Sequence, residues 1–188
     1  MIETGTVEIG TIFYTADLHL GHENVIAYSN RPFSNAAEML ECIILNWNSV
    51  VSADDDVYII GDMFFKINSK EQLEILHRLK GRKHLILGNH DKGFNSNIRN
   101  EFAEITNYLK LDDNGRRVVL SHYPILEWDG YFRGAYHVYG HIHNNFDTPA
   151  YQIIKNNPEH FRNAFNAGVD VTGYTPRTLN ELIRMNDN

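Results

Sequence analysis

Five short clusters of polar residues each follow an apolar segment of this chain. They are Asp17-Leu18-His19, Gly61-Asp62, Gly88-Asn89-His90-Asp91, Ser121-His122 and Gly140-His141-Ile142-His143. Together they supply carboxylates, imidazoles and one amide but no thiolate, and such nitrogen and oxygen donors suit Mn²⁺, Fe, Zn²⁺ or Co²⁺. Ten histidines in 188 residues therefore direct attention first to metal binding.

The spacing within these clusters favours a shared site. The i, i+2 spacing of Asp17 with His19, and of His141 with His143, places both side chains of a pair on the same side of an extended backbone. A glycine directly before Asp62, and in two further clusters, lets the backbone turn sharply close to a ligand. Because ligands of open α/β sheets bind beyond the carboxyl ends of the strands, we expect the five clusters to converge.

The order D-x-H, G-D, G-N-H-D, H and G-H-x-H over residues 17–143 resembles the calcineurin-like metallophosphoesterases, in their compact bacterial or phage type. The resemblance implies two divalent metal ions, with Mn²⁺ expected first and Fe, Zn²⁺, Co²⁺ or Ni²⁺ as alternatives. It implies that the first metal is held by Asp17, His19, Asp62 and His143. It implies that the second is held by Asp62, Asn89, His122 and His141. Asp62 would bridge the two.

The resemblance also implies an enzyme that hydrolyses phosphoesters through a hydroxide bridging the two metals, without a covalent intermediate. His90 would be the catalytic side chain that contacts the substrate and protonates the leaving oxygen. Two cations roughly 3.5–4 Å apart can clamp the attacking and leaving oxygens of an in-line displacement. A general acid on the side opposite to the attacking hydroxide then protonates the leaving oxygen and assists its departure.

The substrate is expected to be a small phosphodiester. The protein-phosphatase branch of the family has an acidic residue and then Arg where this chain has Phe65 and Lys66, which disfavours phosphoserine. A monoester specialist would use further Arg or Lys, and near the clusters the sequence places only Lys66, Lys92 and Arg31. Arg31 is expected on the surface.

Two alternatives remain open from the sequence. A non-catalytic scaffold of the same fold would bind a partner protein, but it has no reason to keep seven ligands and His90. A nuclease acting on long nucleic acid would need a basic groove, and the formal net charge of −7 weighs against one.

The roles of several neighbouring residues are less clearly indicated by the sequence. His22 either contacts substrate or faces solvent, and Asp91 either orients His90 or caps the following helix. Tyr123 and Trp128 are expected to pack in the core rather than to stack on substrate. Ordinary surface or core roles are expected for the remaining polar candidates, which are Cys42, His77, His84, His137 and His160.

Strands are needed to position the clusters, and β-branched or aromatic runs predict them at residues 11–16, 57–60, 84–87, 117–121, 135–139 and 164–171. Asp112 to Gly115 predicts a hairpin turn after a strand at 108–111. Helix starts are predicted by the pairs Asn35/Glu38 and Ser69/Gln72, a helix end by Gly81, and another short helix by Ile98, Phe102 and Ile105. Residues 144–162 are expected to be irregular.

These elements predict an α/β fold of two mixed β-sheets packed face to face, with helices outside, as a single domain over residues 1–188. One cysteine excludes a disulfide framework and a cysteine-based zinc finger. The first ten residues lack the features of a signal peptide, and no stretch approaches the roughly 18 apolar residues of a membrane span. A cytoplasmic protein that binds no membrane is therefore expected, and its oligomeric state is left open.

Overall fold

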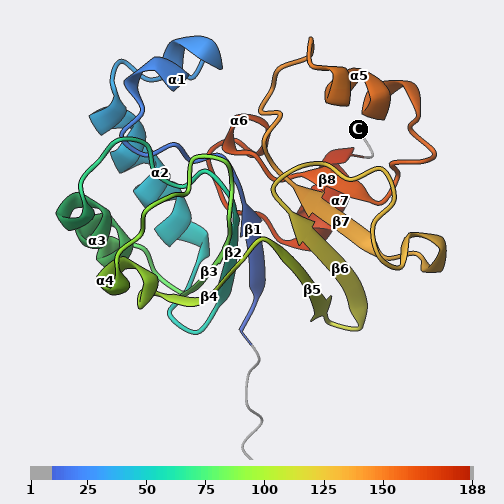
Figure 1. Cartoon of the computed structure of the whole chain (residues 1–188), viewed down its shortest axis with the longest axis horizontal. Helices are drawn as coiled ribbons and strands as arrows, with labels where there is room; N and C mark the ends of the chain where they lie inside the picture. Colours follow the sequence, from blue (N-terminus) through green and yellow to red (C-terminus); the bar gives the residue numbers. More distant parts are fainter. Residues whose placement is uncertain (1–9, 187–188) are drawn as a thin grey trace, which may run out of the picture.

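The computed structural model describes residues 10–186 of the chain. Within them, two four-stranded β-sheets pack face to face, and most helices lie on the outer sides of the sheets (Figure 1). The last helix, Leu179–Asn186, instead packs against a strand of each sheet and adds Leu179 and Leu182 to the core between them. This arrangement confirms the predicted α/β sandwich.

The first sheet has the strand order β1-β2-β3-β4, and all of its strand pairs are parallel rather than mixed as expected. Its strands are β1 (Ile12–Thr15), β2 (Asp56–Ile60), β3 (Arg82–Ile86) and β4 (Phe102–Thr106). Parallel neighbours need crossover connections, which usually contain helices. Here these are α1 (Glu23–Tyr28), α2 (Ala36–Val50), α3 (Ser69–Arg78) and α4 (Ser96–Arg99).

The second sheet is mixed, with the order β5-β6-β7-β8. Its strands are β5 (Tyr108–Asp113), β6 (Arg116–Ser121), β7 (Tyr136–Tyr139) and β8 (Ala164–Asn166). Only the predicted hairpin β5–β6 is antiparallel; β6–β7 and β7–β8 are parallel. The helices of this half are η1 (Tyr131–Arg133), α5 (Pro149–Asn156), α6 (Val169–Thr172) and α7 (Leu179–Asn186).

Three apolar layers hold the sandwich together. Met39 and Trp47 of α2 pack with Leu76 of α3 on the outer face of the first sheet. Between the sheets, buried side chains such as Tyr14 and Val138 meet. A third cluster lies on the outer face of the second sheet. Burial on both faces explains why the strands of the first sheet read as continuous apolar runs.

The predicted helix through Ile98, Phe102 and Ile105 is wrong in its second half. The helix α4 ends at Arg99, and residues 102–106 form the edge strand β4 beside β3. Phenylalanine, isoleucine and threonine in this segment favour a strand, and pairing with β3 satisfies its backbone. The spacing of three apolar residues therefore misled the prediction.

Two helix boundaries also differ from expectation. The capping box of α3 uses Asn68 and Glu71, one residue before the predicted pair, because the Asn68 side chain accepts from the amide of Glu71. The segment expected to be irregular contains α5, which Thr148 caps and which has Pro149 in its first turn. By contrast, Asn35 caps α2 as predicted.

The last predicted strand is shorter than residues 164–171. It ends at Asn166, whose side chain accepts a hydrogen bond from the Gly168 amide, and α6 follows. The helices α1 and α7 were not predicted. No helix within residues 10–186 has the length and apolar character needed to cross a membrane. The prediction about a signal peptide falls on residues 1–10, of which only Gly10 is among the described residues.

Candidate metal centre

The loops that follow five strands bring the predicted site residues together. Asp17 and His19 follow β1, Asp62 follows β2, Asn89 and His90 follow β3, His122 follows β6, and His141 and His143 follow β7. Two groups have their potential ligand atoms within 4.8 Å of one another, and these are Asp17 with His19 and His143, and Asp17 with Asp62 and His122. The strand-end clusters therefore converge, as the sequence predicts.

The Asp62 carboxylate lies in the middle of this arrangement. Its Oδ2 atom is 3.6 Å from Nε2 of His19 and 3.5 Å from Nε2 of His122. The Nε2 atom of His90 is 3.9 Å from the same oxygen. One carboxylate oxygen thus faces imidazoles from both halves of the predicted ligand set.

The side chains predicted to hold the second metal lie less close to one another. The Asn89 Oδ1 atom lies 3.1 Å from Nε2 of His122. The ring centroid of His141 is 5.1 Å from that of His122, although His141 belongs to neither compact group. The His141 amide instead donates to the Asp17 carboxylate at 2.8 Å. Both residues therefore border the site, and Asn89 is in direct contact with a second candidate ligand.

Five of the seven candidate ligands adopt a left-handed backbone conformation. Their φ angles are positive, at 58° for Asp17, 50° for His19, 56° for Asp62, 72° for His141 and 49° for His143. Such angles are uncommon for residues other than glycine and collect at functional sites, where the surrounding structure enforces them. The strand-end loops are therefore bent at the residues that point into the site.

Glycines make the close approach of these loops possible. A Cβ atom on Gly88 would overlap Oδ1 of Asp62, and one on Gly61 would overlap Nδ1 of His122. Any side chain at either position would push a candidate ligand aside. A Cβ atom on Gly140 would likewise overlap Oδ2 of Asp17. The prediction that glycine before Asp62, Asn89 and His141 lets the backbone come close to a ligand is thereby confirmed.

One candidate ligand at the centre lacks the hydrogen-bond partners that a buried side chain needs. Both ring nitrogens of buried His19 are without a hydrogen-bond partner among the described residues. Buried polar groups in native proteins are nearly always paired, so an unpaired imidazole indicates a missing partner. Because carboxylate, imidazole and amide donors surround it, a divalent cation fits this position.

Electrostatics leads to the same conclusion. Burial raises the pKa of the Asp17 carboxyl to about 6, and burial with neighbouring His143 lowers the pKa of His19 to about 3. Burial alone would also raise the pKa of Asp62, but hydrogen bonds from His122 and the His90 amide lower it to about 2. A bound cation would stabilise the charged carboxylates and the neutral imidazole together.

Two candidate ligands are held by their Nδ1 atoms. The Nδ1 atom of His122 lies 2.9 Å from the carbonyl of Ile60, and that of His143 lies 2.6 Å from Oδ2 of Asp170. Since a carbonyl oxygen only accepts, His122 donates from Nδ1, and its Nε2 atom faces the Asp62 carboxylate and Asn89. Hydrogen bonds of this kind orient metal-binding histidines in proteins.

Asp170 was missed by the sequence analysis, and Arg31 was misplaced on the surface. Arg31 is buried and forms a bidentate pair with Asp170, with N–O distances of 2.8 and 2.9 Å. It also donates to the backbone carbonyls of Asp17 and Leu18. Asp170 follows the apolar residues of the last strand, as the other site carboxylates follow theirs, and that pattern was the available signal.

Asp91 has neither of its two expected roles. Its buried carboxylate accepts hydrogen bonds from the amides of Asp62, Met63 and Gly88, at 2.6, 3.0 and 2.9 Å. Burial raises the pKa of this carboxyl although the three amides lower it. Asp91 therefore ties the loop after β3 to the loop after β2.

Aromatic side chains border the open side of the site. The His90 side chain is partly exposed, with its ring centroid 5.2 Å from that of Phe65. His22 stacks on Phe65 at 3.7 Å, so it lines this border rather than facing solvent alone. Across the site, Tyr123 is 50% exposed and lies 4.4 Å from His141, so the expectation that it packs in the core is wrong. Trp128 is buried as predicted.

The other histidines lie outside the centre. Buried His137 contacts the Val119 carbonyl and the Ile125 amide, and His84 pairs with Asp56. On the surface, His77 lies 3.2 Å from Glu101. His160 contacts the Tyr131 hydroxyl. These positions, like that of Cys42 within α2, confirm the ordinary roles expected of them.

Comparison with known proteins identifies relatives over nearly the whole chain. No family model matches the chain. The "Gene 66 protein" of Mycobacterium phage D29 is 28% identical over 163 residues, which cover 72% of this chain and 80% of that protein. The crystal structure of the protein of unknown function AQ665 from Aquifex aeolicus has a TM-score of 0.73 and 27% identity, covering 94% of this chain and 99% of AQ665.

A further relative comes from Methanocaldococcus jannaschii. The uncharacterized protein MJ1445 of Methanocaldococcus jannaschii is 35% identical over 179 residues, covering 93% of this chain and 90% of MJ1445. Identity at this level over almost the full length of both proteins indicates common descent and a common fold. The chain therefore belongs to the family of MJ1445.

Proposed function

We propose that this protein is a dinuclear metal-dependent phosphoesterase of the calcineurin-like type. One metal would be held by Asp17, His19, Asp62 and His143, and the other by Asp62, Asn89, His122 and His141. The observation that carries the proposal is the position of Asp62, whose Oδ2 atom lies within 3.6 Å of imidazoles from both sets. A shared carboxylate between two donor sets is the arrangement that two adjacent cations require.

When bound, the two divalent cations would supply Lewis-acid activation of water and offset the negative charge of the phosphoester. The protein would fix their positions through the backbone of its strained loops. Asp91 would hold the Asp62 loop, and Asp170 would hold the His143 ring, by the contacts described above.

His90 is the side chain best placed to act on the substrate. Its backbone amide donates to Oδ1 of Asp62 at 2.8 Å, which anchors the residue, while its ring remains partly exposed. A ring held at the edge of the centre can approach the leaving oxygen and give it a proton. The ring is therefore assigned to the general acid and not to a metal.

The charges around the site favour phosphodiesters over monoesters. Arg31 is the arginine nearest in the sequence to the first cluster. Its guanidinium is buried and donates its hydrogen bonds to Asp170 and to two backbone carbonyls. The Lys66 ammonium lies over the Phe65 ring, 5.1 Å from its centroid. A dianionic monoester would need additional cations, whereas the single charge of a diester can be balanced by the metals. Mn²⁺ is the first metal to test.

The decisive experiment is reconstitution of metal-stripped protein. Each of Mn²⁺, Fe²⁺, Zn²⁺, Co²⁺ and Ni²⁺ is added to separate samples, and hydrolysis of bis-p-nitrophenyl phosphate and p-nitrophenyl phosphate is compared. We expect restored activity with two metals per chain and a preference for the diester. Full activity in the stripped protein, or in Asp62→Asn, would contradict the dinuclear assignment.

A further inference from the structure

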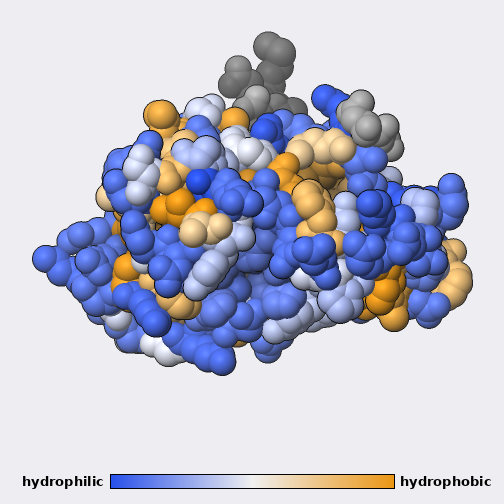
Figure 2. Space-filling model, turned by 90° about the horizontal axis from the view of Figure 1, so that it is seen from above, coloured by the Kyte–Doolittle hydropathy of each residue, from blue (hydrophilic) through white to orange (hydrophobic). Residues whose placement is uncertain are grey.

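A cavity of about 250 Å³ lies beside the candidate metal centre. It is bordered by α5, by α7 and by β8, which is the edge strand of the second sheet. Figure 2 shows the molecule from above. Most of the surface on this side is hydrophilic, and hydrophobic residues form several separate patches. For comparison, a cavity of roughly 150 Å³ is enough to hold benzene. The space is therefore sufficient for one ring system of a ligand.

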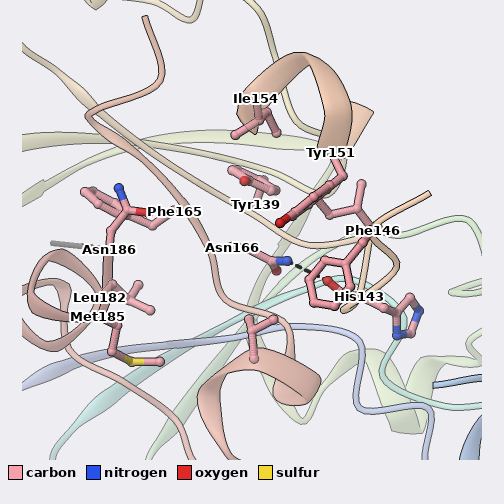
Figure 3. Close-up of a pocket in the computed structure, with 12 residues that line it drawn as sticks. Tyr139, His143, Phe146, Tyr151, Ile154, Phe165, Asn166, Leu182, Met185 and Asn186 are labelled. Atoms are coloured by element: carbon pink, nitrogen blue, oxygen red, sulfur yellow. Dashed lines mark hydrogen bonds between the residues drawn. The ribbon is translucent and has the colours of Figure 1, made fainter. Parts of the chain in front are cut away.

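The walls of this cavity are aromatic. Figure 3 shows Tyr139, Phe146, Tyr151 and Phe165 around it, contributed by β7, by the loop after β7, by α5 and by β8. The rings of Phe146 and Tyr151 meet edge to face, with centroids 5.0 Å apart. Phe146 is 59% exposed although it is large and apolar. An exposed aromatic side chain at the mouth of an aromatic cavity is suited to covering a planar ring.

A hydroxyl group in this lining is free to bond to a ligand. Tyr139 is only 4% exposed, and within residues 10–186 its hydroxyl has no hydrogen-bond partner, yet its oxygen is not cut off from solvent. Burial without compensation raises the pKa of this phenol well above its ordinary value. A hydroxyl at the wall of a cavity can both donate and accept a hydrogen bond. A ligand with a hydrogen-bonding edge would supply the missing partner, whereas a hydrocarbon chain would not.

The cavity and the candidate metal centre share one residue. His143 belongs to both the cavity lining and a candidate ligand group. Asn166, which also lines the cavity, donates to the His143 carbonyl at 2.9 Å, as the dashed line in Figure 3 shows. Val171, which also lines the cavity, directly follows Asp170, the partner of the His143 ring. A group in the cavity could thus belong to the same substrate as a phosphate at the centre.

We propose that this cavity binds the nucleobase of a nucleotide phosphodiester whose phosphate lies at the metal centre. The inference rests on the proposed phosphoesterase function and specifies its substrate class. Aromatic walls favour stacking on a planar ring, and the Tyr139 hydroxyl favours a ring with polar edges. Because no lysine, arginine, aspartate or glutamate is among the described residues that line the cavity, a charged group is disfavoured there.

The test compares two diesters that share one leaving group. The p-nitrophenyl ester of adenosine 5′-phosphate and methyl p-nitrophenyl phosphate both release nitrophenolate, and only the first carries a base. We expect the Mn²⁺-loaded protein to prefer the adenosine ester in kcat/KM. The ratio of the two kcat/KM values should fall about ten-fold in Phe146→Ala, because one stacking contact is worth roughly that factor. Phe132→Ala is the matched control, since Phe132 is 85% exposed and lies outside this cavity.

A second readout does not depend on hydrolysis. Adenosine alone is added to the metal-free protein, and the methyl NMR signals of Ile154, Leu182 and Met185 are followed. Shifts that saturate, and that weaken in Phe146→Ala and Tyr139→Phe but not in Phe132→Ala, would support the site even if neither ester is hydrolysed. Hydrolysis of both esters with an unchanged ratio in Phe146→Ala, or absence of these shifts, would overturn the cavity assignment and leave the phosphoesterase proposal intact.

Discussion

The Nδ1 atom of His143 lies 2.6 Å from Oδ2 of Asp170, and the same carboxylate forms a bidentate pair with buried Arg31. Arg31 in turn holds the backbone carbonyls of Asp17 and Leu18. This chain of contacts joins the loops after β1 and β7, which carry four of the candidate ligands. A single buried carboxylate thus positions a ligand from each half of the sandwich.

Replacing Asp170 with Asn should weaken metal binding without removing any ligand. The amide keeps the shape of the side chain but loses the charge that pairs with Arg31 and orients His143. Outer partners of metal-binding histidines are worth roughly 10- to 100-fold in metal affinity. We therefore expect the dissociation constant for Mn²⁺, measured by competition with a chromogenic chelator, to rise by about that factor.

The matched control for this variant is Asp129→Asn, which removes a carboxylate that is 41% exposed in its side chain and pairs with Lys110. Circular dichroism should show that both variants remain folded at 20 °C. Unfolding by urea should also show a loss of stability in Asp170→Asn, because Arg31 then remains buried with one partner fewer. An unchanged Mn²⁺ affinity in a folded Asp170→Asn protein would remove Asp170 as a positioning residue.

Buried His137 should make the protein less stable in mild acid. Burial lowers the pKa of its imidazole to about 4, against an ordinary value of 6.5, although the Val119 carbonyl favours the charged form. Between these two values the unfolded chain binds a proton that the folded protein does not. The free energy of unfolding therefore falls as the pH drops from 6.5 towards 4, by about 3 kcal/mol in total for this residue.

Urea denaturation at pH 7.5, 6, 5 and 4.5 in the presence of a chelator measures this effect. His137→Gln should be less stable than the wild type at pH 7.5, because it loses the contacts to Val119 and Ile125. The difference between the two proteins should shrink as the pH falls, since glutamine does not titrate. A difference that stays constant over this range would show that His137 does not carry the pH dependence.

The strand-end clusters were predictable because they depend on local order in the sequence. Each apolar run predicts a strand, and each polar cluster then falls at its carboxyl end, where parallel strands share an edge. Glycines at positions 61 and 88 add a second local signal, since both stand directly before a candidate ligand. These features predicted both the layers of the fold and the convergence of Asp17, Asp62 and His122.

The contacts that hold the ligands in place depend on distant pairs and were not predictable in this way. Arg31 and Asp170 are 139 positions apart, and Asp91 contacts the amide of Asp62 across 29 positions. Nothing in the neighbourhood of Arg31 distinguishes a buried arginine from an exposed one. Similarly, the strand β4 was read as helix because its partner β3 lies outside the local window.

Binding of Mn²⁺ should raise the melting temperature of the wild-type protein. Asp17 and Asp62 lie in one compact group, and burial, with a smaller contribution from the charge of Asp62, raises the pKa of Asp17. A ligand that binds only the folded state stabilises it by about 4 kcal/mol at 1,000 times its dissociation constant. Differential scanning calorimetry with Mn²⁺ and with excess chelator measures the change.

The same comparison on Asp62→Asn tests the site itself. This variant loses the proposed bridging charge, so Mn²⁺ should raise its melting temperature much less than that of the wild type. Asp112→Asn is the control, because Asp112 lies in the β5–β6 turn and caps the Gly115 amide. Identical melting curves of the wild type with chelator and with Mn²⁺ would contradict a metal centre of appreciable affinity.

Loss of His90 should matter most for substrates with poor leaving groups. If the His90 ring protonates the departing oxygen, it accelerates release of an alkoxide by on the order of 10²–10⁴, whereas nitrophenolate leaves readily without a proton. His90→Ala keeps all seven candidate ligands, so its metal content should equal that of the wild type. His77→Ala is the matched control, since that ring is largely exposed and pairs with Glu101 far from the site. Measurement of kcat/KM across a series of aryl and alkyl diesters should give a steeper dependence on leaving-group basicity in His90→Ala than in the other two proteins. Parallel slopes would mean that the ring only binds a phosphate oxygen, because every substrate would then slow by a similar factor.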